Sequence, residues 1–447
     1  MKTNLMVLVA GDNNLNVEGG IDIEEMMSVP DTGSELTILV QYDERDSGAK
    51  RYVIRDGKKE STLRLGEINT GSAETVTEFI RWGIENFKAE RNIVVLWNHG
   101  GGTKDNMEVA YPNATNSISR AESNPALGNQ PSLFSQASRM KQVDALMKAY
   151  NLKRGEPTRS LTSAESRSIL LDDEAKDFID NLELKKVFQD VGQKIDIIGF
   201  DACLMNMMEV VYQLKDYAKV IVGSEELEPG NGWDYNAFVN YLVDNPDATN
   251  EAIAQAIVES YIASYDHEPS FLLTLSALST EKLTKVASCM NDFAYSILCK
   301  EPNLRGNFMN VIDQTQTLNY SFNEKKDYRD LKHFVLLTQE QYKEDNEIFV
   351  ASKNLLEALD ELIFVSQTKN FDNAYGLSVY LPLVPNMSKF AQSIFYELDI
   401  NIDTPHWLKL FKQIENIDNE ANPYLKEEKE VAKPVEVDLF EDEDEYN

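Results

Sequence analysis

Asn92-Ile-Val-Val-Leu-Trp97 and Ile195-Asp-Ile-Ile-Gly-Phe200 are the two apolar runs that decide the fold of this 447-residue chain. Continuous Val, Ile and Leu runs are typical of parallel strands buried on both faces of a sheet. The first run is followed by Asn98-His-Gly-Gly-Gly102 and the second by Asp201-Ala-Cys203. Functional side chains of open parallel sheets gather at the carboxyl ends of the strands. The sequence therefore predicts that His99 and Cys203 meet at one end of the sheet.

Apolar runs alternate with amphipathic stretches through the first half of the chain, which is typical of a sheet covered by helices. We expect strands at residues 4–10, 35–42, 51–55, 92–97, 195–200, 218–224 and 271–277. We expect helices at 75–88, at 182–191 with Asn181 as the cap, at 250–265 and at 281–300. The predicted fold class is α/β, with a mostly parallel central sheet flanked by helices and a largely helical C-terminal part.

The chain divides into three predicted parts. Residues 1–280 form an α/β domain that carries both candidate residues, and residues 281–425 form a mainly helical part that returns a strand at 376–381. Residues 426–447 are rich in Asp and Glu and predict a disordered acidic tail. Within the first part, residues 103–168 lack a sustained period and predict an inserted processing or flexible segment. Nine Lys and Arg residues fall in this insert, although the protein as a whole is acidic.

Charge and composition exclude several classes of protein. The chain has 43 Lys and Arg against 75 Asp and Glu, a net charge of −32 that would repel DNA or RNA. Three cysteines, Cys203, Cys289 and Cys299, are too few for a disulfide framework or a cysteine zinc site. No apolar run approaches the about 20 residues of a membrane span, and none resembles a signal peptide. We expect a cytoplasmic protein without nucleic-acid or membrane partners, with secretion left open and a monomer as one option.

A Cys and a His at neighbouring strand ends supply the groups that nucleophilic catalysis by a thiol needs. An imidazole favours the thiolate and can protonate a leaving amine. Gly100 lets a backbone N–H approach a developing oxyanion, and the N–H of Cys203 is a second candidate donor. A helix predicted at 205–214 would also place the sulfur near a helix N-terminus, which favours an anion. Each residue alone is more often a packing residue or a satisfied polar residue, so the interpretation depends on the pair.

Five motifs resemble the clostripain family of cysteine peptidases, in the order in which that family has them. They are Val7-Leu-Val-Ala-Gly-Asp-Asn-Asn-Leu15, Trp97-Asn-His-Gly-Gly-Gly102, Asp201-Ala-Cys-Leu-Met-Asn206, Gly223-Ser-Glu-Glu226 with Gly232-Trp-Asp-Tyr235, and Gly376-Leu-Ser-Val-Tyr-Leu-Pro382. The resemblance implies a caspase-like fold, His99 and Cys203 as the catalytic dyad, and cleavage after Arg or Lys. It also implies that Asp201 lies in the pocket for the basic side chain.

The resemblance places a second acid of that pocket in the loop after the next strand, without saying which residue it is. Glu225, Glu226, Glu228 and Asp234 all lie in this region. The substrate-binding candidates that we carry forward are Asp201, Glu226, Trp233 and Asp234.

Members of this family are often matured by cleavage between the His and the Cys. The basic insert lies in that interval, so we expect autoprocessing of a zymogen there, with Lys148 as one candidate site. The predicted function is a cysteine endopeptidase whose partners are peptides or proteins with Arg or Lys at the cleavage site. Two alternatives stay open, namely a caspase-like interaction module without turnover and a peptidase of the same fold with a different specificity.

The proposed chemistry requires no cofactor, and the sequence assigns no metal-binding residues. Some relatives respond to calcium, and the turn Asp172-Asp-Glu174 contains carboxylates that could supply oxygen ligands. The chain has no EF-hand spacing, so a solvated charged turn is the preferred interpretation.

Overall fold

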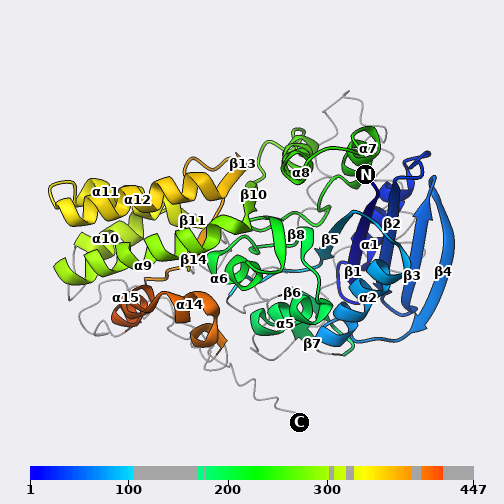
Figure 1. Cartoon of the computed structure of the whole chain (residues 1–447), viewed down its shortest axis with the longest axis horizontal. Coiled ribbons are helices and arrows are strands. Elements are labelled where there is room, and N and C mark those ends of the chain that lie inside the picture. Colours follow the sequence, from blue (N-terminus) through cyan, green and yellow to red (C-terminus); the bar gives the residue numbers. More distant parts are fainter. Residues whose placement is uncertain (104–168, 176, 302–306, 319–326, 384–393, 416–447) are drawn as a thin grey trace, which may run out of the picture.

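The computed structural model describes residues 1–103, 169–175, 177–301, 307–318, 327–383 and 394–415. Most of the predicted insert (103–168), the acidic tail (426–447) and Lys148 lie outside the described residues. The described chain forms a nine-stranded sheet with helices on both sides (Figure 1). The strand order is β13 (Ile363–Lys369), β10 (Leu273–Ser279), β9 (Ala218–Gly223), β8 (Ile195–Asp201), β5 (Arg91–Trp97), β1 (Thr3–Gly11), β2 (Leu36–Glu44), β3 (Gly48–Arg55) and β4 (Lys58–Gly66).

Five consecutive strands in the centre of this sheet, from β9 to β2, are parallel. Their carboxyl ends therefore lie at the same end of the sheet. The four outer strands run antiparallel to their neighbours. A mostly parallel central sheet flanked by helices confirms the predicted fold class.

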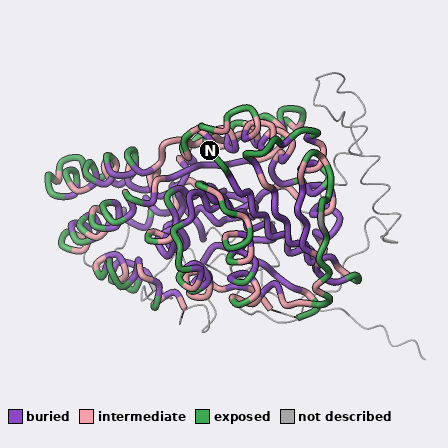
Figure 2. Tube along the Cα trace, turned by 45° about the vertical axis from the view of Figure 1, so that its right-hand side comes forward, coloured by how far each residue is buried: buried purple, intermediate pink, exposed green. Residues whose placement is uncertain are grey.

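Alternate residues of the central strands pack against helices on opposite faces. In β1, Leu5, Val7 and Val9 share one core with α1 (Asn16–Met27), α7 (Tyr235–Asp244) and α8 (Asn250–Ser264). Met6, Leu8 and Ala10 face a second core with α2 (Ala73–Asn86), α5 (Asn181–Val191) and α6 (Met208–Val211). Figure 2 shows the buried residues running along the strands and the exposed ones on the outer surfaces of the helices. This burial on both faces explains the continuous apolar runs in the sequence.

The C-terminal part is mainly helical and extends from the β10–β13 side of the sheet (Figure 1). Its helices are α9 (Leu283–Lys300), α10 (Asn307–Gln314), α11 (Leu331–Gln341), α12 (Asn346–Leu362), α14 (Asp399–Asp403) and α15 (Pro405–Glu415). The predicted strand at 376–381 appears as β14 (Ser378–Tyr380), which pairs with β12 (Tyr328–Asp330) in a small sheet with β11 (Thr317–Leu318). The strand that the C-terminal part adds to the main sheet is β13.

All seven predicted strands of the first half are present, and the prediction missed β4 and β13 at the two edges of the sheet. β4 is rich in charged residues, and every residue of β13 is only half-buried, so neither has the apolar signature of a central strand. A hairpin of β6 (Ile169–Asp172) and β7 (Asp177–Ile179) was also missed.

Four predicted helix starts differ from the structure, those of α2 and α9 by two residues each, and the other two have a cause in local geometry. The cap of α5 is Asp180 and not Asn181, because the Asp180 side chain accepts the N–H groups of Leu182 and Glu183 in a capping box. The helix predicted at 205–214 begins only at Met208 and continues as a 3₁₀ turn (Tyr212–Leu214). Residues before Met208 are not helical, because Leu204 has a φ of +62° and Met207 is extended (φ −120°, ψ 142°). The Leu204 and Asn206 N–H groups donate instead to the carbonyls of Glu226 and Ser224.

Candidate active site

The structure brings His99 and Cys203 to one pocket at the carboxyl ends of β5 and β8. These strands are parallel neighbours in which Trp97 is paired with Asp201, and the Asn98 N–H donates to the Asp201 carbonyl at 3.2 Å. His99 lies two positions after Trp97, and Cys203 lies two positions after Asp201. The pocket between them is lined by Trp97, Asn98, His99, Asp201, Ala202, Cys203, Glu228, Pro229, Gly230, Gly232 and Leu15. The strand-end argument from the sequence therefore predicted the correct juxtaposition.

Cys203 lies in a tight turn between β8 and α6, with 8% of its surface exposed. The next residue, Leu204, has a φ of +62°, a conformation that side chains other than glycine rarely adopt. The Glu228 N–H donates to the Cys203 sulfur at 3.2 Å, and the Glu228 carbonyl lies 3.8 Å from the same sulfur. Burial raises the pKa of the Cys203 thiol to about 12. The sequence predicted that the Cys203 sulfur lies at a helix N-terminus. This prediction is wrong, because α6 starts five residues later, at Met208.

His99 is held by a residue that the sequence analysis did not single out. Its Nε2 lies 2.7 Å from Oδ1 of Asn14, in the loop between β1 and α1. Because an amide oxygen only accepts hydrogen bonds, this contact places the imidazole proton on Nε2 and leaves Nδ1 as the acceptor nitrogen. Burial lowers the pKa of His99 to about 4. In this conformation of the chain, both the thiol and the imidazole are neutral at pH 7.

The three glycines after His99 allow the β5 end to approach the Cys203 turn closely. A Cβ at position 100 would lie 2.1 Å from the Cys203 carbonyl oxygen, so only glycine fits there. Gly102 has a φ of +64°, and the Gly101 carbonyl accepts the Tyr328 hydroxyl at 2.7 Å. Gly100 is also bridged to Ile169, the first residue of β6. The described residues on either side of 104–168, Thr103 and Ile169, therefore both lie near this end of β5.

One wall of the pocket carries two buried carboxyl groups, Asp201 and Glu228, which we call the pocket pair. They are 4% and 7% exposed. Asp201 accepts the Tyr235 hydroxyl at 2.9 Å and the Trp233 N–H at 3.3 Å. Burial raises the pKa of Asp201 to about 6, and burial together with repulsion by Asp201 raises that of Glu228 well above its usual range. No Lys or Arg is among the described residues that line this pocket.

The other substrate-binding candidates lie elsewhere. Asp234 caps α7 through the Ala237 N–H, and the Glu226 carboxylate accepts the N–H of Leu227. The Trp233 indole packs beneath the sheet, where a Cβ on Gly199 would approach it to 2.8 Å. None of the three is among the residues that line the pocket. Trp233 nevertheless contacts the pocket pair, because its backbone N–H donates to Asp201 and its indole N–H acts on the Glu228 carboxyl, whose pKa it lowers. The acid beside Asp201 is therefore Glu228, one of the four acids among which the sequence could not choose.

The remaining histidines and cysteines are distant in the chain from this pocket and do not line it. His333 accepts the Gln316 N–H, and His406 is hydrogen-bonded to Asn291. Cys289 and Cys299 lie on α9, half-buried and exposed, respectively.

The clostripain family model matches residues 7–124 and 154–413, which is most of the chain. This chain belongs to the clostripain family. Clostripain of Hathewaya histolytica is 23% identical over 489 residues, covering 95% of this chain and 82% of that protein. The family identifies the chain as a cysteine protease, a hydrolase that acts on peptides or proteins.

Solved structures of clostripain-family (C11) proteases share the fold. A secreted C11 cysteine protease from Bacteroides thetaiotaomicron, in complex with an irreversible peptide inhibitor, has a TM-score of 0.60 and 18% identity. The match covers 90% of this chain and 99% of that one. An inactive zymogen C11 protease from Parabacteroides distasonis has a TM-score of 0.59 and 16% identity, with 90% and 97% covered. The caspase-like form of the α/β fold is thereby confirmed for this clostripain-family chain.

Across the described residues of this clostripain-family protease, no helix combines the length and the apolar character that crossing a membrane requires. The cytoplasmic localisation stays a prediction, and the B. thetaiotaomicron neighbour is described as secreted.

Proposed function

We propose that this protease hydrolyses peptide bonds after Arg or Lys, with Cys203 as the nucleophile and His99 as the general acid and base. The observation that carries the proposal is the placement of the two residues in one pocket with a pair of buried carboxyl groups. A guanidinium or ammonium group in that pocket would form charge-assisted hydrogen bonds with Asp201 and Glu228. Because the pair has no cationic partner among the described residues of the pocket, a basic substrate side chain would supply the missing charge.

The reaction would proceed through a thioester. Nδ1 of His99 accepts the thiol proton as the Cys203 sulfur attacks the carbonyl carbon, and the imidazolium then protonates the leaving amine. The N–H groups of Gly100 and Cys203 are the proposed donors to the oxyanion. Water hydrolyses the thioester, with His99 again accepting and returning the proton. Asn14 orients the imidazole through its contact with Nε2.

We infer further that the chain is a zymogen processed within residues 104–168. Both described ends of this segment lie beside the pocket, since Gly100 is bridged to Ile169 and the Thr103 N–H faces the Met207 sulfur at 3.3 Å. The backbone of Glu228 meanwhile covers the Cys203 sulfur, and the thiol is held neutral. Cleavage of the segment would release this end of the sheet and let the Glu228 loop withdraw. Lys148 stays one candidate for the cleaved position.

The test compares matched fluorogenic peptides that end in Arg, Lys, Asn or Asp. The wild-type chain should turn over the Arg and Lys peptides only, Cys203→Ala should be inactive, and Cys289→Ala should behave like the wild type. Hydrolysis by Cys203→Ala would overturn the assignment of the nucleophile. Preferred turnover of the Asn or Asp peptide would support the alternative of a different specificity.

A denaturing gel of the same samples tests processing. The wild type should separate into two chains, the Cys203→Ala protein should stay single, and mass spectrometry should place the new terminus within 104–168. Full activity of an uncleaved wild-type chain would overturn the zymogen proposal. An uncleaved chain that hydrolyses none of the peptides would favour the interaction-module alternative.

A further inference from the structure

Two buried carboxyl groups outside the pocket join the loop that carries Glu228 to the C-terminal part of the chain. Glu225 lies in this loop, three residues before Glu228, and Asp330 is the last residue of β12. We call Glu225 and Asp330 the interface pair. They are 1% and 0% exposed, and the proposed reaction does not use them. Asp330 also caps α11, because its side chain accepts the His333 N–H at 2.6 Å.

The two carboxyl groups lie side by side on one turn of the C-terminal part. The Tyr375 N–H donates to Oδ2 of Asp330 at 2.5 Å, and the next N–H in the chain, that of Gly376, donates to Oε2 of Glu225 at 2.7 Å. The Glu225 and Asp330 side chains are hydrogen-bonded to each other. Because a carboxylate has only acceptor oxygens, this bond requires that one of the two groups keeps its proton.

The charged side chains nearest to the interface pair do not replace that proton. Lys332 of α11 acts on Asp330 through its charge, but it is itself ion-paired with Asp360. From the loop of the pocket, Glu226 adds a further negative charge beside Glu225. Two buried acids that lack a cationic partner retain a proton, because both cannot be charged at this distance.

The other groups packed around this turn have partners of their own. The His333 ring accepts a backbone N–H through Nδ1, and burial lowers its pKa. Arg329 of β12 donates to two backbone carbonyls, and Glu209 of α6 accepts a backbone N–H of β14. β10 and β13 present the hydroxyl groups of Ser276 and Ser366. Among these described groups, none is ion-paired with the interface pair.

The donors around each carboxyl group indicate which of the two keeps the proton. Asp330 accepts an N–H on each of its oxygens, which favours its carboxylate form. Glu225 accepts an N–H on Oε2 alone, and its Oε1 is fully buried without a donor among the described residues. Burial raises the pKa of Asp330 to about 7, and burial together with repulsion by Asp330 raises that of Glu225 well above its usual range. Oε1 of Glu225 is therefore the oxygen that carries the proton.

We propose that protonated Glu225 donates a hydrogen bond to the Asp330 carboxylate, and that through this bond the C-terminal part positions the loop that carries Glu228. Both are positioning residues, since neither lines the pocket. The loop between Glu225 and Glu228 contacts the turn of the nucleophile directly. The Glu226 carbonyl accepts the Leu204 N–H at 3.1 Å, and the Glu228 N–H donates to the Cys203 sulfur at 3.2 Å. Loss of the bond at Glu225 would therefore loosen the loop at the sulfur.

A second contact from β12 supports this role of the C-terminal part. Tyr328 lies two residues before Asp330, and its hydroxyl donates to the Gly101 carbonyl at 2.7 Å. One strand thus contacts both the glycines that follow His99 and, through Asp330, the loop that carries Glu228. The positioning role rests on the proposed peptidase function, whereas the shared proton does not.

Chemical denaturation of the full-length Cys203→Ala chain, which lacks the proposed nucleophile, tests the proton. Glu225→Gln replaces the protonated acid by a neutral amide that can donate to Asp330 and accept the Gly376 N–H, so this variant should be at least as stable as its parent at pH 7. Asp330→Asn turns an amide N–H toward a backbone donor such as the Tyr375 N–H. It should raise the unfolding equilibrium constant at least about tenfold.

The pH dependence of unfolding counts the proton directly. Above the ordinary pKa of Glu, the folded parent holds one proton that its unfolded form has lost, so its stability falls as the pH rises. Between about pH 5 and pH 8 its unfolding equilibrium constant should therefore rise about tenfold more per pH unit than that of Glu225→Gln. Asp345→Asn is the matched control, since Asp345 caps α12 in the same way and is paired with Lys300 in place of a buried acid. It should change the constant by less than about threefold and leave its pH dependence as in the parent.

Two further readouts test the positioning role in the chain that retains Cys203. Glu225→Ala should increase the rate of Cys203 alkylation by iodoacetamide at least about threefold, measured by mass spectrometry relative to Cys289, because the Glu228 backbone no longer covers the sulfur. The same variant should lower kcat/KM for Arg peptides about tenfold. Glu225→Gln should restore both quantities to within about twofold of the parent.

Equal pH dependence of the parent and Glu225→Gln, or a Glu225→Gln chain less stable than Asp330→Asn, would overturn the shared proton. Glu225→Gln decides if Asp330→Asn does not fold. An unchanged alkylation rate in a destabilised Glu225→Ala chain would overturn the positioning role and leave the pair as a purely structural contact. Absence of turnover in every chain would count against the proposed peptidase function alone, because unfolding and alkylation do not depend on turnover.

Discussion

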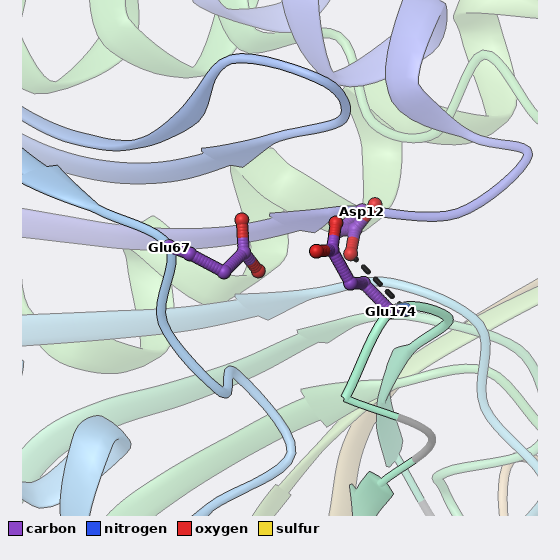
Figure 3. A group of neighbouring side chains, drawn as sticks. All are labelled: Asp12, Glu67 and Glu174. Atoms are coloured by element: carbon purple, nitrogen blue, oxygen red, sulfur yellow. Dashed lines mark hydrogen bonds between the residues drawn. The ribbon is translucent and has the colours of Figure 1, made fainter.

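The pocket pair and a second group of carboxylates near the ends of β1 and β2 differ in burial. The second group comprises Asp12, Asp43, Glu67, Asp172 and Glu174, and we call it the acidic cluster. Figure 3 shows the Glu67 carboxylate facing Asp12 and Glu174. Asp201 and Glu228 are enclosed, and Asp201 is oriented by the Tyr235 hydroxyl and the Trp233 N–H. The acidic cluster has five carboxylates, two of which are exposed. An enclosed pair with fixed donors suits one side-chain cation in a defined orientation.

The two groups are close enough in the chain to affect each other through one loop. Asp12 belongs to the acidic cluster, and Asn14 contacts His99 in the pocket. Asn13 and Asn98 join this loop to β6, since both donate to the Leu171 carbonyl. Variants that affect one group and spare the other therefore test whether the two have separate roles.

Asp201→Asn should have the largest effect and should affect the pocket alone. Removing one charged partner of a buried ion pair costs about 2–5 kcal/mol, so kcat/KM for Arg and Lys peptides should fall by about 10³-fold. Steady-state kinetics of the variant and of the parent chain measure the effect. A fall of less than about threefold in kcat/KM would show that Asp201 does not bind the basic side chain.

Glu228→Gln should lower kcat/KM for the same peptides by about 100-fold. Its effect is smaller because Asp201 keeps its charge and its two donors. Glu226→Gln is the matched control, since Glu226 is also buried (2% exposed, against 7% for Glu228) but does not line the pocket. Kinetics with Arg and Lys peptides should separate the two variants. If Glu226→Gln were the more impaired, the second acid would be Glu226, as the sequence had left open.

The pH dependence of kcat/KM should report ionisation of the pocket pair. Burial raises the pKa of Asp201 to about 6, so the free pocket loses its charge as the pH falls through that value. Activity on Arg peptides should therefore drop about tenfold per pH unit below 6 and level off above it. Activity on peptides with citrulline, the uncharged analogue of Arg, should not show this drop below pH 6. A drop of equal size with the citrulline peptides would show that ionisation of the pocket pair does not control binding of the Arg side chain.

The sequence predicted the strands that are buried on both faces of the sheet. Continuous apolar runs identify β5 and β8 as central parallel strands. The carboxyl ends of such strands lie at the same end of the sheet, which places His99 and Cys203 together. The edge strands β4 and β13 were missed because exposure to solvent leaves them polar. The turn after Cys203 was predicted as helix because the pairing of Leu204 and Asn206 with the Ser224–Glu226 segment is a long-range contact.

Dependence on long-range contacts also explains why some site residues could not be identified from the sequence. Four acids lie near one another in the sequence, and the fold of the loop alone brings Glu228 to Asp201 while Asp234 caps a helix. Asn14 lies 85 positions from His99. The acidic cluster combines segments from Asp12 to Glu174. The sequence favoured a solvated charged turn at Asp172-Asp-Glu174, because the neighbours of that turn depend on strand order.

Two glycines with positive φ give the smallest and most closely matched test. Gly232 (φ +55°) lies against the pocket pair, where a Cβ would approach Oδ1 of Asp201 to 2.8 Å. Gly66 (φ +77°) directly precedes Glu67 of the acidic cluster, and a Cβ there would meet nothing within 4 Å. Alanine at either position should lower the free energy of unfolding by about 1 kcal/mol, the cost of the left-handed conformation.

Only Gly232→Ala should also lower kcat/KM for Arg peptides, by about tenfold, because its methyl group displaces the Asp201 carboxylate. Gly66→Ala should keep kcat/KM within about twofold, since open space receives its methyl group. Chemical denaturation and steady-state kinetics of the two variants measure both effects. Equal activities would mean that the Asp201 carboxylate can move without consequence, and the rigid, enclosed pair would then not be what distinguishes the pocket from the acidic cluster.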